Sequence, residues 1–235
     1  MNSEAGFGKI LKHKTEDESK EKELFKEIAE KIKEISREGE KIGFGMTAEV
    51  FTSKTDASVC YKIIRKEHPI FRNGVHKEAD ILTKACRLKA GVILPEPYYS
   101  IETGEEKNLE VLVMKKLDAV SVENLIGNKL DLPENFDFNG FFAKLENYFN
   151  KLHDNKIFHR DFHWGNVMIE NVTGAPCVID FGMSKEEHLS SENPYKIVNS
   201  RGAEHFITDD MIRLKEVRNQ LRKYIFEKRQ AGAGN

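Results

Sequence analysis

Apolar residues recur at helical spacing in four parts of the chain. Near the N-terminus, a stretch rich in Lys and Glu carries one narrow apolar stripe, formed by Leu24, Ile28, Ile32 and Ile35. Spacings of three and four residues predict an amphipathic helix there, which Gly39 would end. The same periodicity predicts further helices over Val75–Leu88, over Asn139–Asp154 and from Asp210 to Arg229.

Shorter β-type runs lie between these helices. Strands are predicted at Glu49–Phe51, Ser58–Ile64, Leu109–Met114, Val167–Ile169 and Cys177–Ile179, the last two joined by a Thr173-Gly174 turn. Pro95 and Pro97 indicate a loop. Strands with one helix thus precede a mostly helical half, which predicts an α+β chain with two unequal lobes. We expect a charged helical extension over 1–38, an N-lobe over 39–117 and a C-lobe over 118–235.

Composition narrows the classes of function. The chain of 235 residues carries 37 basic and 39 acidic side chains, so no global positive field would recruit nucleic acid. No apolar run approaches the ~20 residues of a membrane span. Three scattered cysteines fit a reducing compartment, so we expect a cytoplasmic protein, with delivery into another cell's cytosol left open. The N-terminal helix either packs on the rest of the chain or contacts a partner.

Two features before residue 80 suggest a nucleotide site. The Ile42–Val50 segment places Gly43 and Gly45 between strand-like runs, and glycines let backbone N–H groups approach phosphates closely; a plain hairpin is the alternative. Lys62 lies within an apolar strand, where an unpaired ammonium would be costly. It needs a phosphate or a carboxylate such as Glu78, unless it reaches solvent from an edge strand.

The segment from Ile157 to Gly182 carries the strongest signal. Asp161 and Asn166 form an Asp-x-x-x-x-Asn motif, and Asp180-Phe181-Gly182 follows after two short strands. A carboxylate can accept a proton from an incoming hydroxyl, while carboxylate and amide oxygens can hold Mg²⁺ against a triphosphate. Asp161, Asn166 and Asp180 together supply that chemistry.

With these motifs in this order, the chain resembles the protein kinase-like superfamily from Glu40 to Gly182, about 60% of its length. The resemblance implies a two-lobed fold with a small β-rich N-lobe and a reduced helical C-lobe, using ATP and Mg²⁺. It implies that Gly43 and Gly45 cover the phosphates, that Lys62 pairs with the α/β-phosphates and Glu78, and that Asp161 is the catalytic base. Asn166 and Asp180 would hold the metal. The nucleotide base would contact Val50, Cys60, Met114 and the connector that ends at Leu117.

Departures from the usual pattern bear on the acceptor. His163 stands where protein kinases carry Lys, Ala48 replaces the third glycine, and no Ala-Pro-Glu follows Gly182. The missing Ala-Pro-Glu and the shortened C-lobe resemble minimal bacterial kinases of the effector type, whereas His163 resembles aminoglycoside- and lipopolysaccharide-kinase-like and other atypical members. We therefore expect an ATP-dependent serine/threonine protein kinase with a protein substrate. An aminoglycoside- or lipopolysaccharide-kinase-like enzyme and a nucleotide-binding pseudokinase are the alternatives.

His159 and Arg160, which precede Asp161, each have two possible roles. His159, with Asp161 and a further histidine such as His163, His188 or His205, could imitate an iron site, but a buried supporting histidine is the simpler interpretation. Arg160 could bind a phosphate in the segment after Gly182. We instead expect it to bond that segment's backbone or an acidic neighbour such as Glu187.

Overall fold

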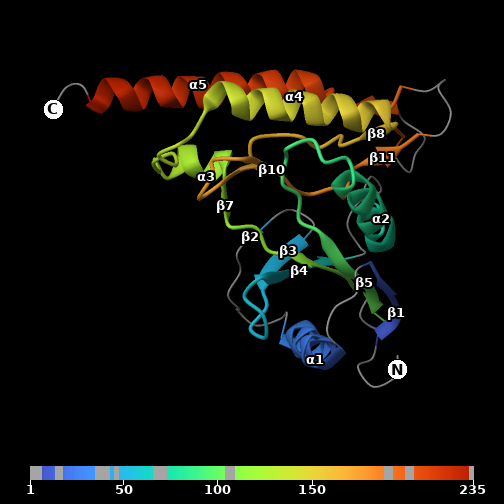
Figure 1. The fold of residues 1–235 in the computed structure, drawn as a ribbon. Coiled ribbons are helices and arrows are strands. Elements are labelled where there is room, and N and C mark those ends of the chain that lie inside the picture. The colour runs from blue at the N-terminus through green and yellow to red at the C-terminus, as the bar shows by residue number, and fades with distance from the viewer. Residues whose placement is uncertain are drawn as a thin grey trace. The chain divides into compact units, whose positions relative to one another are not determined.

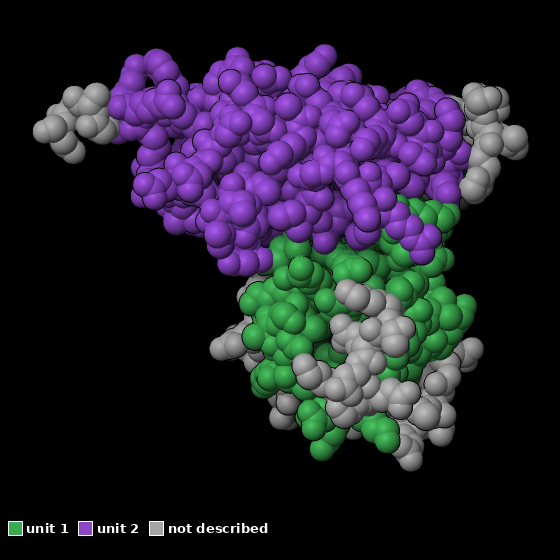
Figure 2. All heavy atoms as spheres, viewed as in Figure 1, with its two compact units in different colours: residues 1–84, 95–117 green, residues 85–94, 118–235 purple. Residues whose placement is uncertain are grey.

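The computed structural model describes residues 7–13, 18–34, 43–44, 48–65, 73–103, 109–187, 193–198 and 204–232. The elements are labelled along the chain in Figure 1. Two compact units are present: unit 1 comprises residues 1–84 and 95–117, and unit 2 comprises residues 85–94 and 118–235 (Figure 2).

Unit 1 is built on a six-stranded antiparallel sheet with the order β1-β5-β6-β4-β3-β2. The strands are β1 (Phe7–Lys12), β2 (Gly43–Phe44), β3 (Ala48–Thr52), β4 (Val59–Arg65), β5 (Pro97–Thr103) and β6 (Leu109–Lys115). The sequence pattern predicts β3, β4 and β6 but neither β1 nor β5. Pro97, predicted to lie in a loop, instead opens β5, where the first strand position tolerates the missing N–H. The β5–β6 register is irregular between Pro97 and Tyr99.

One helix packs on each face of this sheet, because successive side chains of a strand point to opposite faces. Tyr61 and Ile63 of β4 share a core with the buried apolar stripe of α1 (Glu18–Glu34), which consists of Leu24, Ile28 and Ile32. Ile64 of β4 packs on the other face, against Val75 and Ala79 of α2 (Val75–Cys86). The predicted N-terminal stripe is therefore buried within unit 1; Ile35 and Gly39 lie outside the described residues.

In its described residues, unit 2 contains the helices α3 (Val122–Gly127), α4 (Phe138–Asp154) and α5 (Asp210–Gly232). The helices α4 and α5 lie side by side (Figure 1). Asp137 caps α4 by accepting the N–H of Asn139 at 3.1 Å. The apolar stripe of α4 is buried; it consists of Phe141, Phe142, Leu145, Tyr148, Phe149 and Leu152. Leu214, Val217 and Leu221 of α5 are buried as well. Both helices thus form where the sequence periodicity predicts them.

Three small antiparallel sheets complete unit 2. They pair β7 (Ala119–Ser121) and β10 (Pro176–Val178) with β9 (Val167–Glu170), β8 (Ile157–Phe158) with β11 (Lys185–Glu186), and β12 (Lys196–Val198) with β13 (Glu204–Phe206). The predicted hairpin between β9 and β10 is present, with Gly174 at φ 68° in its turn. The fold is α+β, a β-sheet N-terminal part followed by a mostly helical part. Among the helices within the described ranges, none has the length and apolar composition needed to span a membrane.

Candidate active site

Unit 1 contains a buried ion pair between Lys62 and Glu78. The Lys62 Nζ atom donates to Glu78 Oε1 at 3.0 Å, and the two residues are only 4% and 1% exposed. Lys62 is on β4, between β3 and β6, and its side chain is on the sheet face that α2 covers. The structure thus brings these two predicted residues together. The alternative that Lys62 reaches solvent from an edge strand is wrong.

Four other unit 1 candidates lie on strands of the same sheet. Gly43 of β2 is opposite Val50 of β3, and Cys60 of β4 is opposite Met114 of β6. Gly45 lies outside the described residues. Burial raises the pKa of the Cys60 thiol to about 12, so this cysteine is a packing residue rather than a nucleophile.

The connector from the last residue of β6, Lys115, to Leu117 has backbone N–H groups that are already hydrogen-bonded. The N–H of Lys115 donates to the carbonyl of Glu96 at 2.9 Å, and the N–H of Lys116 donates to that of Ser58 at 2.7 Å. Leu117 follows and is half-buried. Of the connector residues expected to contact the nucleotide base, Lys115 and Lys116 thus already use their backbone N–H groups within unit 1.

In unit 2, the loop between β8 and β9 holds Asp161 and Asn166 against each other. The Asn166 side-chain amide donates to the backbone carbonyl of Asp161 at 2.8 Å and to its carboxylate Oδ2 at 3.2 Å. Both N–H bonds of the amide are therefore directed at Asp161, so the remaining polar atom of Asn166 is its oxygen. The turn that brings Asp161 and Asn166 together thus spans the five residue positions of the Asp-x-x-x-x-Asn motif.

Asp180 joins this arrangement from the end of β10. The N–H of Ile179 donates to the carbonyl of Asn166 at 3.0 Å, and Asp180 Oδ1 accepts the N–H of Gly182 at 3.1 Å. Asp180 has φ 62°, a conformation that a non-glycine residue adopts at a cost and often at functional sites. Burial, followed by the negative charge of Asp180, raises the pKa of Asp161. The two carboxylates are thus near enough to repel each other.

His159 packs beneath the surface and supports the loop that carries Asp161. It is fully buried, its ring packs edge-on against Phe181 with centroids 4.8 Å apart, and its Nε2 lies 3.0 Å from the carbonyl of Ile179. Because a carbonyl only accepts, that nitrogen carries the proton. In the part of the chain that the structure describes, no three His, Cys, Asp or Glu side chains form a metal-binding group; His188 lies outside it. His159 is thus a supporting residue, as expected.

Asp210, at the first residue of α5, is a site residue that sequence reasoning missed. Its carboxylate accepts the backbone N–H of His159 at 2.9 Å and that of Arg160 at 2.8 Å. Arg160 has φ 70°, so Asp210 holds a strained turn immediately before Asp161. Burial alone would raise the pKa of Asp210, but hydrogen bonds, the first from His153, bring it below its usual value. The sequence signal was only an acidic residue at a predicted helix start.

The Arg160 side chain connects the same loop to the segment after Gly182. Its Nη2 donates to the backbone carbonyl of Lys196 in β12 at 3.2 Å, which confirms the expected backbone contact. On the other side of the loop, the N–H of Gly165 donates to His163 Nδ1 at 3.0 Å. A Cβ on Gly165 would lie 2.8 Å from both Glu123 Oε2 and His163 Cε1, so a larger residue here would have to displace these two side chains.

Within each unit, then, the site has the parts of an enzyme that handles a phosphorylated nucleotide: a buried lysine–carboxylate pair in a β-sheet unit, and a carboxylate–amide–carboxylate set in a helical one. Comparison with family models is consistent with this class. The protein kinase domain matches residues 36–221, well over half of the chain. The chain therefore belongs to the protein kinase domain family, and this membership supports phosphotransferase activity. A search among curated proteins finds no match.

Proposed function

We propose that this chain is an ATP- and Mg²⁺-dependent kinase that transfers the γ-phosphoryl group to a serine or threonine hydroxyl of a protein. The observation that carries the proposal is the Asp161–Asn166–Asp180 arrangement. A loss of any of these groups would favour a binding protein over an enzyme, and all three are present with Asn166 hydrogen-bonded to Asp161.

Asp161 is proposed as the residue that orients and deprotonates the acceptor hydroxyl. A group in this role must be held in one position, because positioning supplies much of the rate of phosphoryl transfer. Asn166 fixes the Asp161 carboxylate from one side, and Asp210 fixes the backbone just before it. The raised pKa of Asp161 brings it closer to the range of a useful base.

Asn166 and Asp180 are proposed to hold Mg²⁺. Amide and carboxylate oxygens are the ligands that this ion prefers, and it is commonly bound by one or two protein groups with water and phosphate completing its shell. The amide N–H bonds of Asn166 are used by Asp161, which favours its oxygen for a metal. When bound, Mg²⁺ neutralises charge on the phosphate oxygens. A cation there would also offset the repulsion between Asp161 and Asp180.

The nucleotide itself is proposed to bind unit 1 residues. Lys62, oriented by Glu78, would pair with the α/β-phosphates. Gly43 and Gly45 would cover the phosphates, and the nucleotide base would contact the residues Val50, Cys60, Met114 and Leu117. Cys60 and Met114 are direct neighbours across β4 and β6, which supports a shared role.

A protein acceptor is supported by the segment that follows Asp180. The strands β12 and β13 pair antiparallel there, and the Arg160 side chain donates to the carbonyl of Lys196 in β12. Strand edges offer backbone groups to an extended peptide. His163 is the feature that favours a small-molecule acceptor, so the experiment must include one.

Incubation with γ-labelled ATP and Mg²⁺ tests the proposal, with generic proteins in one arm and aminoglycosides or lipopolysaccharide sugars in the other. We expect label on protein serine or threonine. Label found only on the small molecules would overturn the protein-kinase part. A wild-type protein that shows no thermal shift at millimolar Mg²⁺-ATP would overturn the kinase proposal as a whole, and a shift without turnover would indicate a pseudokinase.

The Asp161→Asn variant sharpens this test. Because Asp161 acts on the hydroxyl mainly in the transition state, we expect most turnover to be lost while the Mg²⁺-ATP thermal shift is kept. Asp180→Ala should reduce the shift as well, since it removes a charged metal ligand. Equal loss of shift in both variants would contradict the separate roles given to them.

A further inference from the structure

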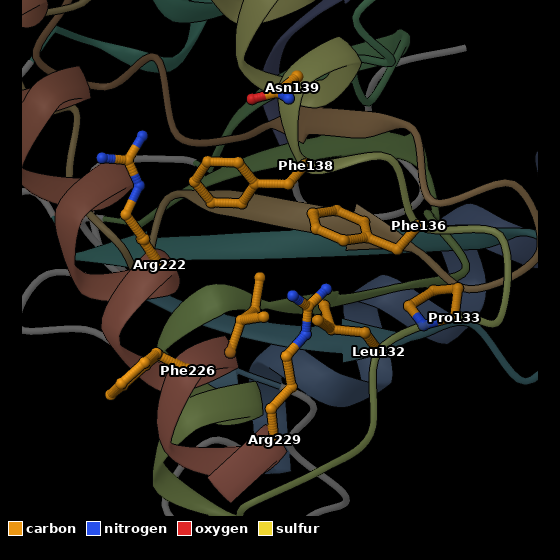
Figure 3. Close-up of a pocket in the computed structure, with 9 residues that line it drawn as sticks. Leu132, Pro133, Phe136, Phe138, Asn139, Arg222, Phe226 and Arg229 are labelled. Carbon is orange, nitrogen blue, oxygen red and sulfur yellow. The ribbon is translucent and has the colours of Figure 1, made fainter.

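Unit 2 has a pocket of about 390 Å³ that the proposed chemistry does not use. One wall is a face of α5 carrying Arg222, Ile225, Phe226 and Arg229, and the other includes Leu132 and Phe138, before and at the start of α4 (Figure 3). The spacing of three, four and seven residues places the four α5 side chains on one helix face. We refer to this site as the α5 pocket.

The α5 pocket exposes apolar surface that a folded chain normally covers. Phe226 is 60% exposed, and Leu132, Phe138 and Ile225 are only half-buried. Contiguous apolar surface of this kind marks contact sites on soluble domains. A concave volume of this size accommodates an inserted aromatic or aliphatic side chain, within the ~300–1,000 Å³ of typical ligand sites.

Two guanidinium groups flank this apolar centre. Arg222 lies over the ring of Phe138, 5.5 Å from its centroid, and Figure 3 shows the Arg229 side chain extending into the pocket. One neighbouring acid, Asp131, pairs with Lys228 at 2.8 Å rather than with either arginine. Across the described ranges, no carboxylate forms an ion pair with Arg222 or Arg229. The pocket therefore presents unneutralised positive charge beside apolar surface.

We propose that the α5 pocket binds an acidic peptide segment of a partner protein, with an apolar side chain as its anchor. Charge complementarity selects this occupant. Between residues 222 and 229, α5 carries four basic side chains and one acidic side chain, so the same face of a second copy would be repelled. A concave pocket also suits an inserted side chain better than the flat surface of an anionic membrane.

The spacing of the arginines specifies the peptide further. Arg222 and Arg229 are seven residues apart, about 10 Å along the helix axis. In an extended peptide, residues two apart are on the same face and about 6.7 Å apart. The pattern acidic–x–apolar–x–acidic thus places its apolar side chain at the level of Ile225 and Phe226. The flexible arginines then reach the two carboxylates.

Selection from a random peptide display library against the full chain tests this inference. We expect the selected peptides to be enriched in that pattern, and synthetic labelled copies to bind in a fluorescence anisotropy titration. Reversing either charge, Arg222→Glu or Arg229→Glu, should weaken binding by about tenfold or more. The matched control is Lys215→Glu, the same charge change at an exposed position of the same helix, about 10 Å from Arg222 and about 20 Å from Arg229 along the helix axis; it should bind like wild type.

Phe226→Ser gives a second test that removes apolar surface without changing charge. It should also weaken binding, with little change in thermal unfolding because the side chain is mostly exposed. Selected peptides without acidic residues, or binding that both arginine reversals leave unchanged, would overturn the inference. Binding to phosphatidylserine vesicles in place of peptides would assign the pocket to a membrane instead. Each readout is independent of phosphoryl transfer, so an inactive protein that binds the peptide still supports it.

Discussion

Replacing Lys62 by methionine removes one half of the buried ion pair while keeping most of the side-chain volume. The Glu78 carboxylate, whose side chain is 2% exposed, then loses its partner 3.0 Å away. Breaking such a pair by deleting one member costs about 3–5 kcal/mol, because the desolvated charge that remains loses this compensation. We therefore expect Lys62→Met to lower the free energy of unfolding by about that amount.

The double variant Lys62→Met/Glu78→Leu separates charge from packing. If the stranded carboxylate is the cause, replacing it by an apolar side chain should recover most of the lost stability, since buried ion pairs are often exchanged for apolar residues without loss. The control is Lys77→Met, at an exposed position of α2, the helix that carries Glu78; it should change stability by less than about 0.5 kcal/mol.

Urea denaturation followed by far-UV circular dichroism is the appropriate assay. Tryptophan fluorescence is unsuitable as the only probe, because the single tryptophan, Trp164, lies in unit 2 while the pair lies in unit 1. A Lys62→Met variant within about 1 kcal/mol of wild type would refute the reasoning. So would a double variant as unstable as the single one, because the loss would then come from packing.

Two further predictions concern residues outside the proposed chemistry. Asp210→Ala leaves the buried N–H of His159 and the part-buried N–H of Arg160 without their acceptor, and the buried one alone costs about 1–3 kcal/mol. The variant should therefore be less stable and should exchange hydrogen faster at both residues; unchanged exchange by mass spectrometry would contradict this. His13 Nε2 and His76 Nδ1 each lie 2.7 Å from the Ser100 hydroxyl, and burial lowers the pKa of both histidines. Just below about pH 6.5, the unfolded state therefore takes up protons more readily than the folded state. Thermal stability should fall as pH drops through that range, and His13→Gln with His76→Asn, which keep the hydrogen bonds, should flatten the dependence.

The sequence predicted those helices and motifs that a local pattern indicates without knowledge of their tertiary contacts. The stripe of α4 repeats every three to four residues, and Leu24, Ile28 and Ile32 do the same in α1, so local periodicity alone indicates each helix and its buried face. The Asp161-x-x-x-x-Asn166 spacing is similarly local, because one short turn joins the two side chains. Lys62 is a different case: the cost of burying a lone ammonium predicted an anionic partner before any contact was known.

The strand β5 shows why other elements escaped prediction. It opens with Pro97 two residues after Pro95, and prolines indicate a loop; its alternation of apolar and polar side chains, Tyr99-Ser100-Ile101-Glu102, is only four residues long. The buried polar residue Ser100 is explained only by His13 and His76, which reach it from distant parts of the chain. Its pairing with β1 and β6 decides that this segment is a strand.

The sequence by itself determined the order of the motifs, the helical stripes and the requirement that Lys62 be paired, because these depend on neighbours within a few residues or on the chemistry of one group. Only the tertiary structure decided that Asp210 holds the backbone ahead of Asp161 and that the end of α5 forms a pocket with the segment before α4. These contacts join residues 50 or more positions apart, as does the bond from Tyr224 to the carbonyl of Leu130 across 94 positions. No local pattern encodes such a partner, since one acidic or aromatic side chain at a helix end has many equally favourable uses until the chain has folded.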